Sequence, residues 1–252
     1  MELFSLEGCT ALVTGVNRGI GLALAEALAE AGADIIGLYR TDCRAAEKAV
    51  TRYGRRFHAL QCNLEQTPVE GLSEAVRQAV NLGGRLDIVV NNAGIIRRSP
   101  AVEHSETDWD AVLQVNLKAV FFLTQAAARV MKEQGRGKII NIASMLSFQG
   151  GILVPSYTAS KHGVVGITRA LANEWAACGI NVNAIAPGYI ATDNTAPLRA
   201  DPVRNRSILE RIPAGRWGTP ADLKGAVVFL ASPASDYVNG AVIPVDGGWL
   251  SR

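Results

Sequence analysis

The strongest constraint on the fold is an alternation of short apolar runs with longer segments of helical period. A short apolar run predicts a buried strand, and apolar residues spaced by three and four predict a helix. Strands that alternate with helices form parallel sheets, because each crossover returns the chain to the same edge. The expected strands are residues 11–14, 35–39, 57–61, 86–90, 138–142, 180–185 and 241–245, and the expected helices are 20–31, 45–53, 69–81, 109–133, 157–177 and 222–230.

About seven parallel strands with helices on both faces form an α/β, doubly wound Rossmann sheet. The 252 residues contain no linker, low-complexity tract or internal repeat, so residues 1–252 are expected to be a single dinucleotide-binding catalytic domain. Residues 188–207 are predicted to be irregular, since they include Pro197, Pro202 and many polar residues. Ligands bind beyond the carboxyl ends of such strands. We therefore predict that 188–207 is a substrate lid.

Charge and cysteine content narrow the class of protein. Lys and Arg number 25 against 23 Asp and Glu, a formal net charge of +2, which gives no reason to expect nucleic-acid or membrane binding. The four cysteines lie far apart with no metal-ligand spacing, so no metal site is predicted. No apolar run is long enough to span a bilayer, and residues 1–10 do not resemble a signal or transit peptide. These features predict a cytoplasmic enzyme.

A glycine-rich turn, Thr14-Gly15-Val16-Asn17-Arg18-Gly19-Ile20-Gly21, follows the first predicted strand and opens the first helix. Its glycines allow the backbone to approach a pyrophosphate, which the helix N-terminus attracts. The spacing differs from G-x-G-x-x-G, and such a turn can also exist without a ligand. Its place after the first strand favours a nicotinamide dinucleotide bound by Gly15, Asn17, Arg18, Gly19, Ile20 and Gly21.

The second predicted strand ends at Leu38-Tyr39-Arg40, where an NAD-specific site would place an acid for the adenosine ribose. Arg40, next to Tyr39, and Arg18 could instead pair with a 2′-phosphate. Alternatively, both arginines are solvated surface residues. Local charge thus favours tolerance of NADP without excluding NAD.

Three residues suggest acid–base chemistry. Ser144 follows the fifth predicted strand, and Tyr157 and Lys161 are four residues apart at the start of the next helix, on one helix face. A lysine ammonium one turn away, together with an oxidised nicotinamide, could bring the Tyr157 phenol toward neutral pKa. Tyr157 would then be the general acid or base, and Ser144 would hydrogen-bond the reacting oxygen. Each residue alone has a more ordinary explanation, and only their joint occurrence favours catalysis.

The chain resembles the short-chain dehydrogenase/reductase family, with T-G-x-x-x-G-x-G at 14–21, N-N-A-G at 91–94 and a serine before Y-x-x-x-K. The resemblance implies that Asn116 positions Lys161 and a proton-relay water. It also implies a homotetramer. Implied cofactor contacts are Tyr157, Lys161, Asn63 and Leu64 after the third strand, Asn91, Ala93 and Gly94, and Pro187, Gly188, Ile190 and Thr192 beside the nicotinamide.

Longer strings point to a narrower group. Ile95-Ile96-Arg97-Arg98, the run from Ser144 to Gly151, and Arg211-Ile212-Pro213-Ala214-Gly215-Arg216-Trp217-Gly218 resemble the 2-dehydro-3-deoxy-D-gluconate 5-dehydrogenases, also described as 2-deoxy-D-gluconate 3-dehydrogenases. This resemblance implies interconversion of 2-dehydro-3-deoxy-D-gluconate and its 2,5-diketo form, in pectin degradation. It also implies NAD, in conflict with the charges of Arg18 and Arg40.

A sugar acid needs a cation for its carboxylate and polar partners for its hydroxyls. We expect Arg97 or Arg98 to bind the carboxylate and Ser144, Gln149 and Tyr157 to contact the substrate. Asn194 and Arg206 are weaker candidates. Two alternatives remain open: a 3-oxoacyl-[acyl-carrier-protein] reductase, which shares these motifs, and a non-catalytic dinucleotide-sensing protein.

Overall fold

The computed structural model describes residues 2–252 and contains the expected parallel sheet. Its strand order is β3-β2-β1-β4-β5-β6-β7, and every neighbouring pair is parallel. The chain reverses its winding direction between β1 and β4, and the crevice at such a point is where doubly wound folds bind ligands. The strands are β1 (Thr10–Thr14), β2 (Asp34–Tyr39), β3 (Phe57–Gln61), β4 (Ile88–Asn91), β5 (Gly137–Ile142), β6 (Ile180–Pro187) and β7 (Val242–Val245).

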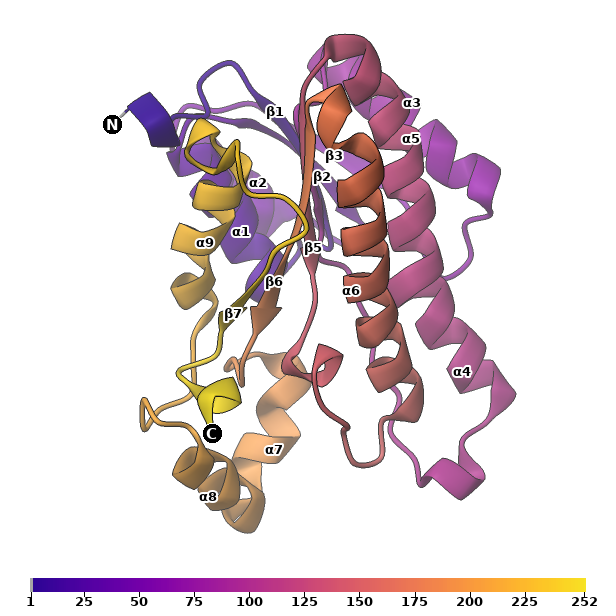
Figure 1. The fold of residues 1–252 in the computed structure, drawn as a ribbon, viewed down its shortest axis with the longest axis vertical. Helices are drawn as coiled ribbons and strands as arrows, with labels where there is room; N and C mark the ends of the chain where they lie inside the picture. Colours follow the sequence, from indigo (N-terminus) through magenta and orange to yellow (C-terminus); the bar gives the residue numbers. More distant parts are fainter. Residues whose placement is uncertain (1) are drawn as a thin grey trace.

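Helices cover both faces of the sheet, as predicted (Figure 1). Strand β1 is buried along its whole length, which explains why it reads as a continuous apolar run rather than an alternating one. One face is covered by α1 (Gly19–Glu30), α2 (Arg44–Thr51) and α9 (Lys224–Ala231), and the other by α3 (Val69–Gly83), α5 (Ala119–Gln134) and α6 (Pro155–Trp175).

The helix predicted at 109–133 is interrupted. Helix α4 (Glu106–Leu113), capped by Ser105, passes through a π-helical turn at Gln114–Lys118 into α5. By length and composition alone Glu106–Gln134 could cross a membrane. Its apolar side chains instead pack against α3, α6 and the sheet, so it is a buried core helix.

The prediction that 188–207 is irregular is wrong. This segment contains a 3-10 turn at Asp193–Thr195, then α7 (Ala196–Ala200) and the start of α8 (Pro202–Arg211). Pro202 occupies the first turn of α8, where its missing N–H is no loss, and the Asp201 side chain caps that helix. The residues that suggested a loop are therefore helix-start signals. Figure 1 shows α7 and α8 together at one end of the molecule.

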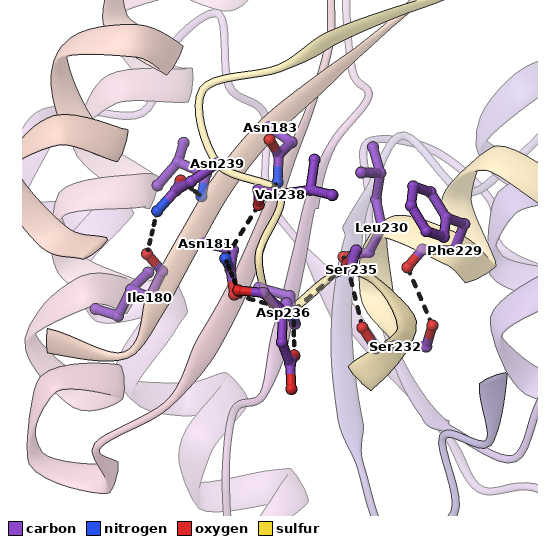
Figure 2. A network of polar contacts seen from close by, with 12 residues as sticks. Ile180, Asn181, Asn183, Phe229, Leu230, Ser232, Ser235, Asp236, Val238 and Asn239 are labelled. Carbon is purple, nitrogen blue, oxygen red and sulfur yellow. Dashed lines mark hydrogen bonds and ion pairs between the residues drawn. The ribbon is translucent and has the colours of Figure 1, made fainter. Parts of the chain in front are cut away.

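Asparagine side chains secure the amino-terminal end of β6 (Figure 2). The amide of Asn181 donates to the backbone oxygens of Asp236 and Val238, both at 3.0 Å, and that of Asn183 donates to Val238 O at 2.8 Å. Asn239 Oδ1 accepts a hydrogen bond from the β6 backbone. The connection that leads into β7 is thus held at the end of the sheet opposite α7 and α8.

Candidate active site

A cavity of about 1000 Å³ lies beyond the carboxyl ends of the strands, extending from the glycine turn to α8. It brings together residues that are far apart in the sequence. Three of the predicted site residues, Asn91, Asn116 and Arg206, are not on its wall. The predicted residues that line it are Gly15, Asn17, Arg18, Gly19, Ile20, Gly21, Tyr39, Arg40, Asn63, Leu64, Ala93, Gly94, Arg97, Arg98, Ser144, Gln149, Tyr157, Lys161, Pro187, Gly188, Ile190, Thr192 and Asn194.

The glycine turn has the geometry of an anion cradle. Gly15 and Gly19 adopt positive φ (70° and 55°), which other residues rarely adopt. A Cβ at Gly21 would collide with the carbonyl oxygen of Gly15, so the turn can pack this closely only with glycine. Arg18 begins α1 in extended conformation and gives no side-chain cap, which leaves N–H groups of the first turn free for phosphate oxygens. These residues fit the pyrophosphate of a dinucleotide.

Both arginines expected at the adenosine end already have acidic neighbours. Arg18 pairs with Asp193 at 2.6 Å, and Arg40 lies 4.0 Å from Glu65. Glu65 lines the cavity and was not predicted from the sequence, because the expected acid belongs at the end of β2 and Glu65 follows β3. A 2′-phosphate would have to compete with these carboxylates for the guanidinium groups.

Ser144 is held in place by the short turn that it begins. Its backbone is extended, its Oγ accepts a hydrogen bond from Leu146 N at 3.1 Å, and the Ser147 Oγ accepts one from Ser144 N at 3.3 Å. The Ser147 hydroxyl in turn donates to the carbonyl of Lys161 at 2.7 Å. Ser144 is thus joined to the helix that carries Tyr157.

Tyr157 and Lys161 lie on one face of α6, with Lys161 Nζ 5.6 Å from the Tyr157 ring centroid. Burial lowers the pKa of Lys161 from 10.5 to about 8, and its Nζ donates to Ile142 O at 2.6 Å. Burial raises the pKa of the Tyr157 phenol, while a Ser144 hydrogen bond and the charge of Arg98 act to lower it. The Lys161 ammonium thus bonds to the carbonyl of Ile142 at the end of β5, and the charge that acts to lower the pKa of the phenol is that of Arg98.

Asn116 lies in the π-helical turn and is fully buried. Its Oδ1 accepts from Ile95 N at 2.8 Å, and its Nδ2 donates to Ile95 O at 2.9 Å and to Ser160 Oγ at 3.2 Å. Ser160 directly precedes Lys161, so Asn116 connects the loop after β4 with the catalytic face of α6. Such π-turns often mark functional sites.

Asn91 differs from its expected position at the adenosine side. Its side chain is buried in the sheet and donates to Thr124 Oγ1 and Asn141 Oδ1, both at 2.8 Å. The next residue, Asn92, lines the cavity instead and donates to Thr14 O at 2.9 Å. Successive residues at a strand end point to opposite sides, which explains why one asparagine of the motif faces inward.

The two arginines after β4 point to different partners. Arg97 pairs with Asp108 at 3.2 Å and lies 3.8 Å from Glu65. Arg98 instead donates to Asn194 O at 3.3 Å and acts electrostatically on the Tyr157 phenol. Of the two, Arg98 is therefore the cation whose charge acts on the Tyr157 phenol.

Helix α8 contributes wall residues that sequence reasoning missed. Arg204, Ser207, Ile208 and Arg211 all line the cavity, and their spacing is that of one helix face. Arg206, the predicted candidate, falls off that face. Arg211 stacks on the Trp249 ring at 4.0 Å and donates to Gln149 Oε1 at 3.1 Å. A correct helix assignment for 202–211 would have selected this set.

Comparisons with known proteins agree with this geometry. The family model described as enoyl-(acyl carrier protein) reductase matches residues 15–250. The chain is 58% identical to the 2-dehydro-3-deoxy-D-gluconate 5-dehydrogenase of Escherichia coli (strain K12) over 100% of this chain and 99% of the relative, and 56% identical to that of Bacillus subtilis (strain 168) over 100% and 98%.

Among solved structures, a proposed 2-deoxy-D-gluconate 3-dehydrogenase from Agrobacterium tumefaciens with bound NADP is 56% identical, with a TM-score of 0.94 and coverage of 100% of both chains. Whole-chain similarity of this degree agrees with the glycine turn and with the Ser144, Tyr157 and Lys161 arrangement. The chain therefore belongs to the short-chain dehydrogenase/reductase family and is an NAD(P)-dependent oxidoreductase that acts on CH–OH groups.

Proposed function

We propose that the protein is a 2-dehydro-3-deoxy-D-gluconate 5-dehydrogenase, which interconverts this sugar acid and its 2,5-diketo form. The observation that carries the proposal is that Ser144, Tyr157 and Lys161 line one cavity together with Arg98, whose charge acts on the Tyr157 phenol. The similarity to two enzymes of that name over nearly their full length supports the same substrate.

The glycine turn would hold NAD(P), which when bound would supply or accept the hydride. Ser144 Oγ donates a hydrogen bond to the reacting oxygen and holds the carbonyl carbon in place. In reduction, the Tyr157 phenol donates its proton to that oxygen. In oxidation, the Tyr157 phenolate removes the hydroxyl proton. Lys161 Nζ lies 5.6 Å from the Tyr157 ring centroid, and Asn116 donates a hydrogen bond to Ser160, the residue before Lys161.

Arg98 is the proposed partner of the substrate carboxylate, because it is an exposed residue of the cavity wall and its charge acts on the Tyr157 phenol. Arg97 is committed to Asp108 and Glu65, so its expected role in carboxylate binding passes to Arg98. Gln149, whose Oε1 accepts a hydrogen bond from Arg211, is the proposed partner of substrate hydroxyls. Residues 188–207, which include α7 and the first part of α8, are the proposed lid.

The proposed enzyme uses both NAD and NADP. Arg40 at the end of β2 supports NADP binding, and its nearness to Glu65 reduces the advantage that a 2′-phosphate would gain. The structurally similar Agrobacterium protein was crystallised with NADP. The proposed assembly is a cytoplasmic homotetramer, on family resemblance, and light scattering of the purified protein would measure its mass.

The deciding experiment is a screen of keto and hydroxy sugar acids with both cofactors, following the absorbance of the reduced nicotinamide. The proposal predicts the highest kcat/KM with 2-dehydro-3-deoxy-D-gluconate or its diketo form. Purified enzyme that reduces acetoacetyl thioesters but no keto sugar acid would instead be a 3-oxoacyl-[acyl-carrier-protein] reductase. Cofactor binding without turnover of any carbonyl compound would favour a dinucleotide sensor.

A further inference from the structure

Residues 97–104 lie between β4 and α4, and the part that follows Arg98 makes contacts that have no role in the proposed mechanism. His104 follows a 3-10 turn at Ala101–Glu103. Its imidazole lies between two serines, with Nδ1 2.6 Å from Ser99 Oγ and Nε2 2.9 Å from Ser156 Oγ. Both ring nitrogens are therefore engaged by hydroxyl groups, which can donate or accept as needed.

One of these serines is next to the catalytic tyrosine. Ser156 is fully buried and directly precedes Tyr157 in the first turn of α6. Helix α6 begins without a side-chain cap at Val154, so its first turn depends on other contacts for its position. Hydrogen bonds from outside the helix can satisfy and orient such a terminus.

The chain just before α6 depends on the same segment. Leu153 has a φ of 64°, the left-handed conformation that non-glycine residues rarely adopt. Its carbonyl accepts a hydrogen bond from Ser99 N at 3.1 Å. Residues 99–104 thus hold the start of α6 at two points, the Leu153 carbonyl and the Ser156 hydroxyl.

The other end of the segment carries the two arginines. Arg98 is adjacent to Ser99 and donates to Asn194 O in the proposed lid. Arg97 is fixed to Asp108 of α4 at 3.2 Å. A single short segment therefore connects the proposed carboxylate-binding residue, the start of the tyrosine helix and the lid.

We propose that His104 is a positioning residue that, by joining Ser99 to Ser156, holds Arg98 and the Tyr157 phenol at a fixed separation. The substrate can then bind Arg98 through its carboxylate and Tyr157 through its reacting oxygen at the same time. The identity of the substrate in this statement rests on the proposed function, whereas the connection between the segment and α6 does not. Small displacements of reacting groups have large effects on rate, so a bond outside the cavity can matter for turnover.

The test begins with His104→Ala. We expect kcat/KM for the keto sugar acid to fall about 10-fold or more through both kcat and the substrate KM, while the cofactor KM changes less than twofold. His104→Gln, which keeps a donor and an acceptor, should recover most of the loss. Val102→Ala is the matched control, because Val102 is 94% exposed on the adjacent turn. Thermal unfolding of each variant checks that the fold is retained.

A second variant tests the bond itself. Ser156→Ala should cause a similar loss, and the His104→Ala/Ser156→Ala double variant should lose little more than either single one. Additive losses, an equal rise in the cofactor KM, or wild-type kinetics for His104→Ala would overturn the proposal. If the enzyme turns over no sugar acid, the proposed function fails. The positioning role is then tested on whichever carbonyl compound is reduced, where kcat must fall in His104→Ala and recover in His104→Gln.

Discussion

The two ends of the cavity differ in how firmly the protein holds their polar groups. At the catalytic end, Lys161 is 4% exposed and Asn116 is fully buried, and each has defined hydrogen-bond partners. At the adenosine end, the side chains of Arg18 and Arg40 are 65% and 62% exposed, and their partners are surface carboxylates. A buried polar group is costly unless it is hydrogen-bonded, so its partners hold it in one position. Water competes for an exposed charge, so an exposed ion pair holds its side chains only weakly. Single substitutions at the catalytic end should therefore change turnover strongly. Single substitutions at the adenosine end should change the preference for NADPH over NADH only weakly.

The largest effect is expected at the phenol. Tyr157→Phe removes the proton donor and leaves the ring and its packing, so kcat should fall by about 10²–10⁴-fold, the usual contribution of a general acid or base. The dissociation constant of NADPH, measured by fluorescence titration, should stay near that of the wild type. Turnover within a few-fold of wild type would contradict the assignment of Tyr157.

Arg98→Ala should have the next largest effect. Loss of a charge-assisted bond to the substrate carboxylate should lower kcat/KM about 100-fold, mainly through the substrate KM. Because the charge of Arg98 lowers the pKa of the Tyr157 phenol, the limb of the pH–rate profile for alcohol oxidation should also move to higher pH. Arg97→Ala removes the same charge beside it, and it should leave that limb in place. Equal shifts in both variants would mean that Arg98 has no special position.

The lowered pKa of Lys161 should make the unfolding free energy depend on pH. Its pKa falls from 10.5 to about 8 on folding, so the unfolded chain binds more protons between these values and stability rises with pH across that window. The neutral variant Lys161→Met lacks this dependence. The difference in unfolding free energy between variant and wild type should therefore shift by about 2 kcal/mol in favour of the wild type between pH 7 and pH 9.5. Urea denaturation at both pH values measures it, and a constant difference would mean that burial does not perturb this lysine.

Much of the catalytic end was predictable because its constraints are local and periodic. The strand that ends before Ser144 is recognisable as a short apolar run, and the four-residue spacing of Tyr157 and Lys161 predicts that both lie on one helix face. Partners across the fold were not predictable. The hydrogen bonds of Asn116 to Ile95 and Ser160 join residues that are 21 and 44 positions apart in the sequence, so no local sequence pattern predicts them.

Residues 188–207 show a different limit of sequence-based prediction. Pro197 and Pro202 suggest a loop, although proline is compatible with the first turn of a helix and Asp201 is a strong N-cap. Because 202–211 was not assigned as a helix, the cavity-facing set of Arg204, Ser207 and Arg211 could not be derived. The acids Glu65 and Asp193 were missed for another reason, since their positions opposite Arg40 and Arg18 depend on tertiary structure.

The smallest effect is expected at the adenosine end, and it tests the comparison most directly. Arg40→Ala should lower kcat/KM with NADPH about 5-fold, the scale of an exposed ion pair, and leave kcat/KM with NADH nearly unchanged. Glu65→Gln should act in the opposite direction, because the carboxylate no longer competes with the 2′-phosphate for the Arg40 guanidinium. Arg77→Ala is a matched control, since it removes an equally exposed arginine from α3. Both effects should shrink at high ionic strength. A 100-fold loss with NADPH in Arg40→Ala would show that this end, like the catalytic end, is held in one geometry.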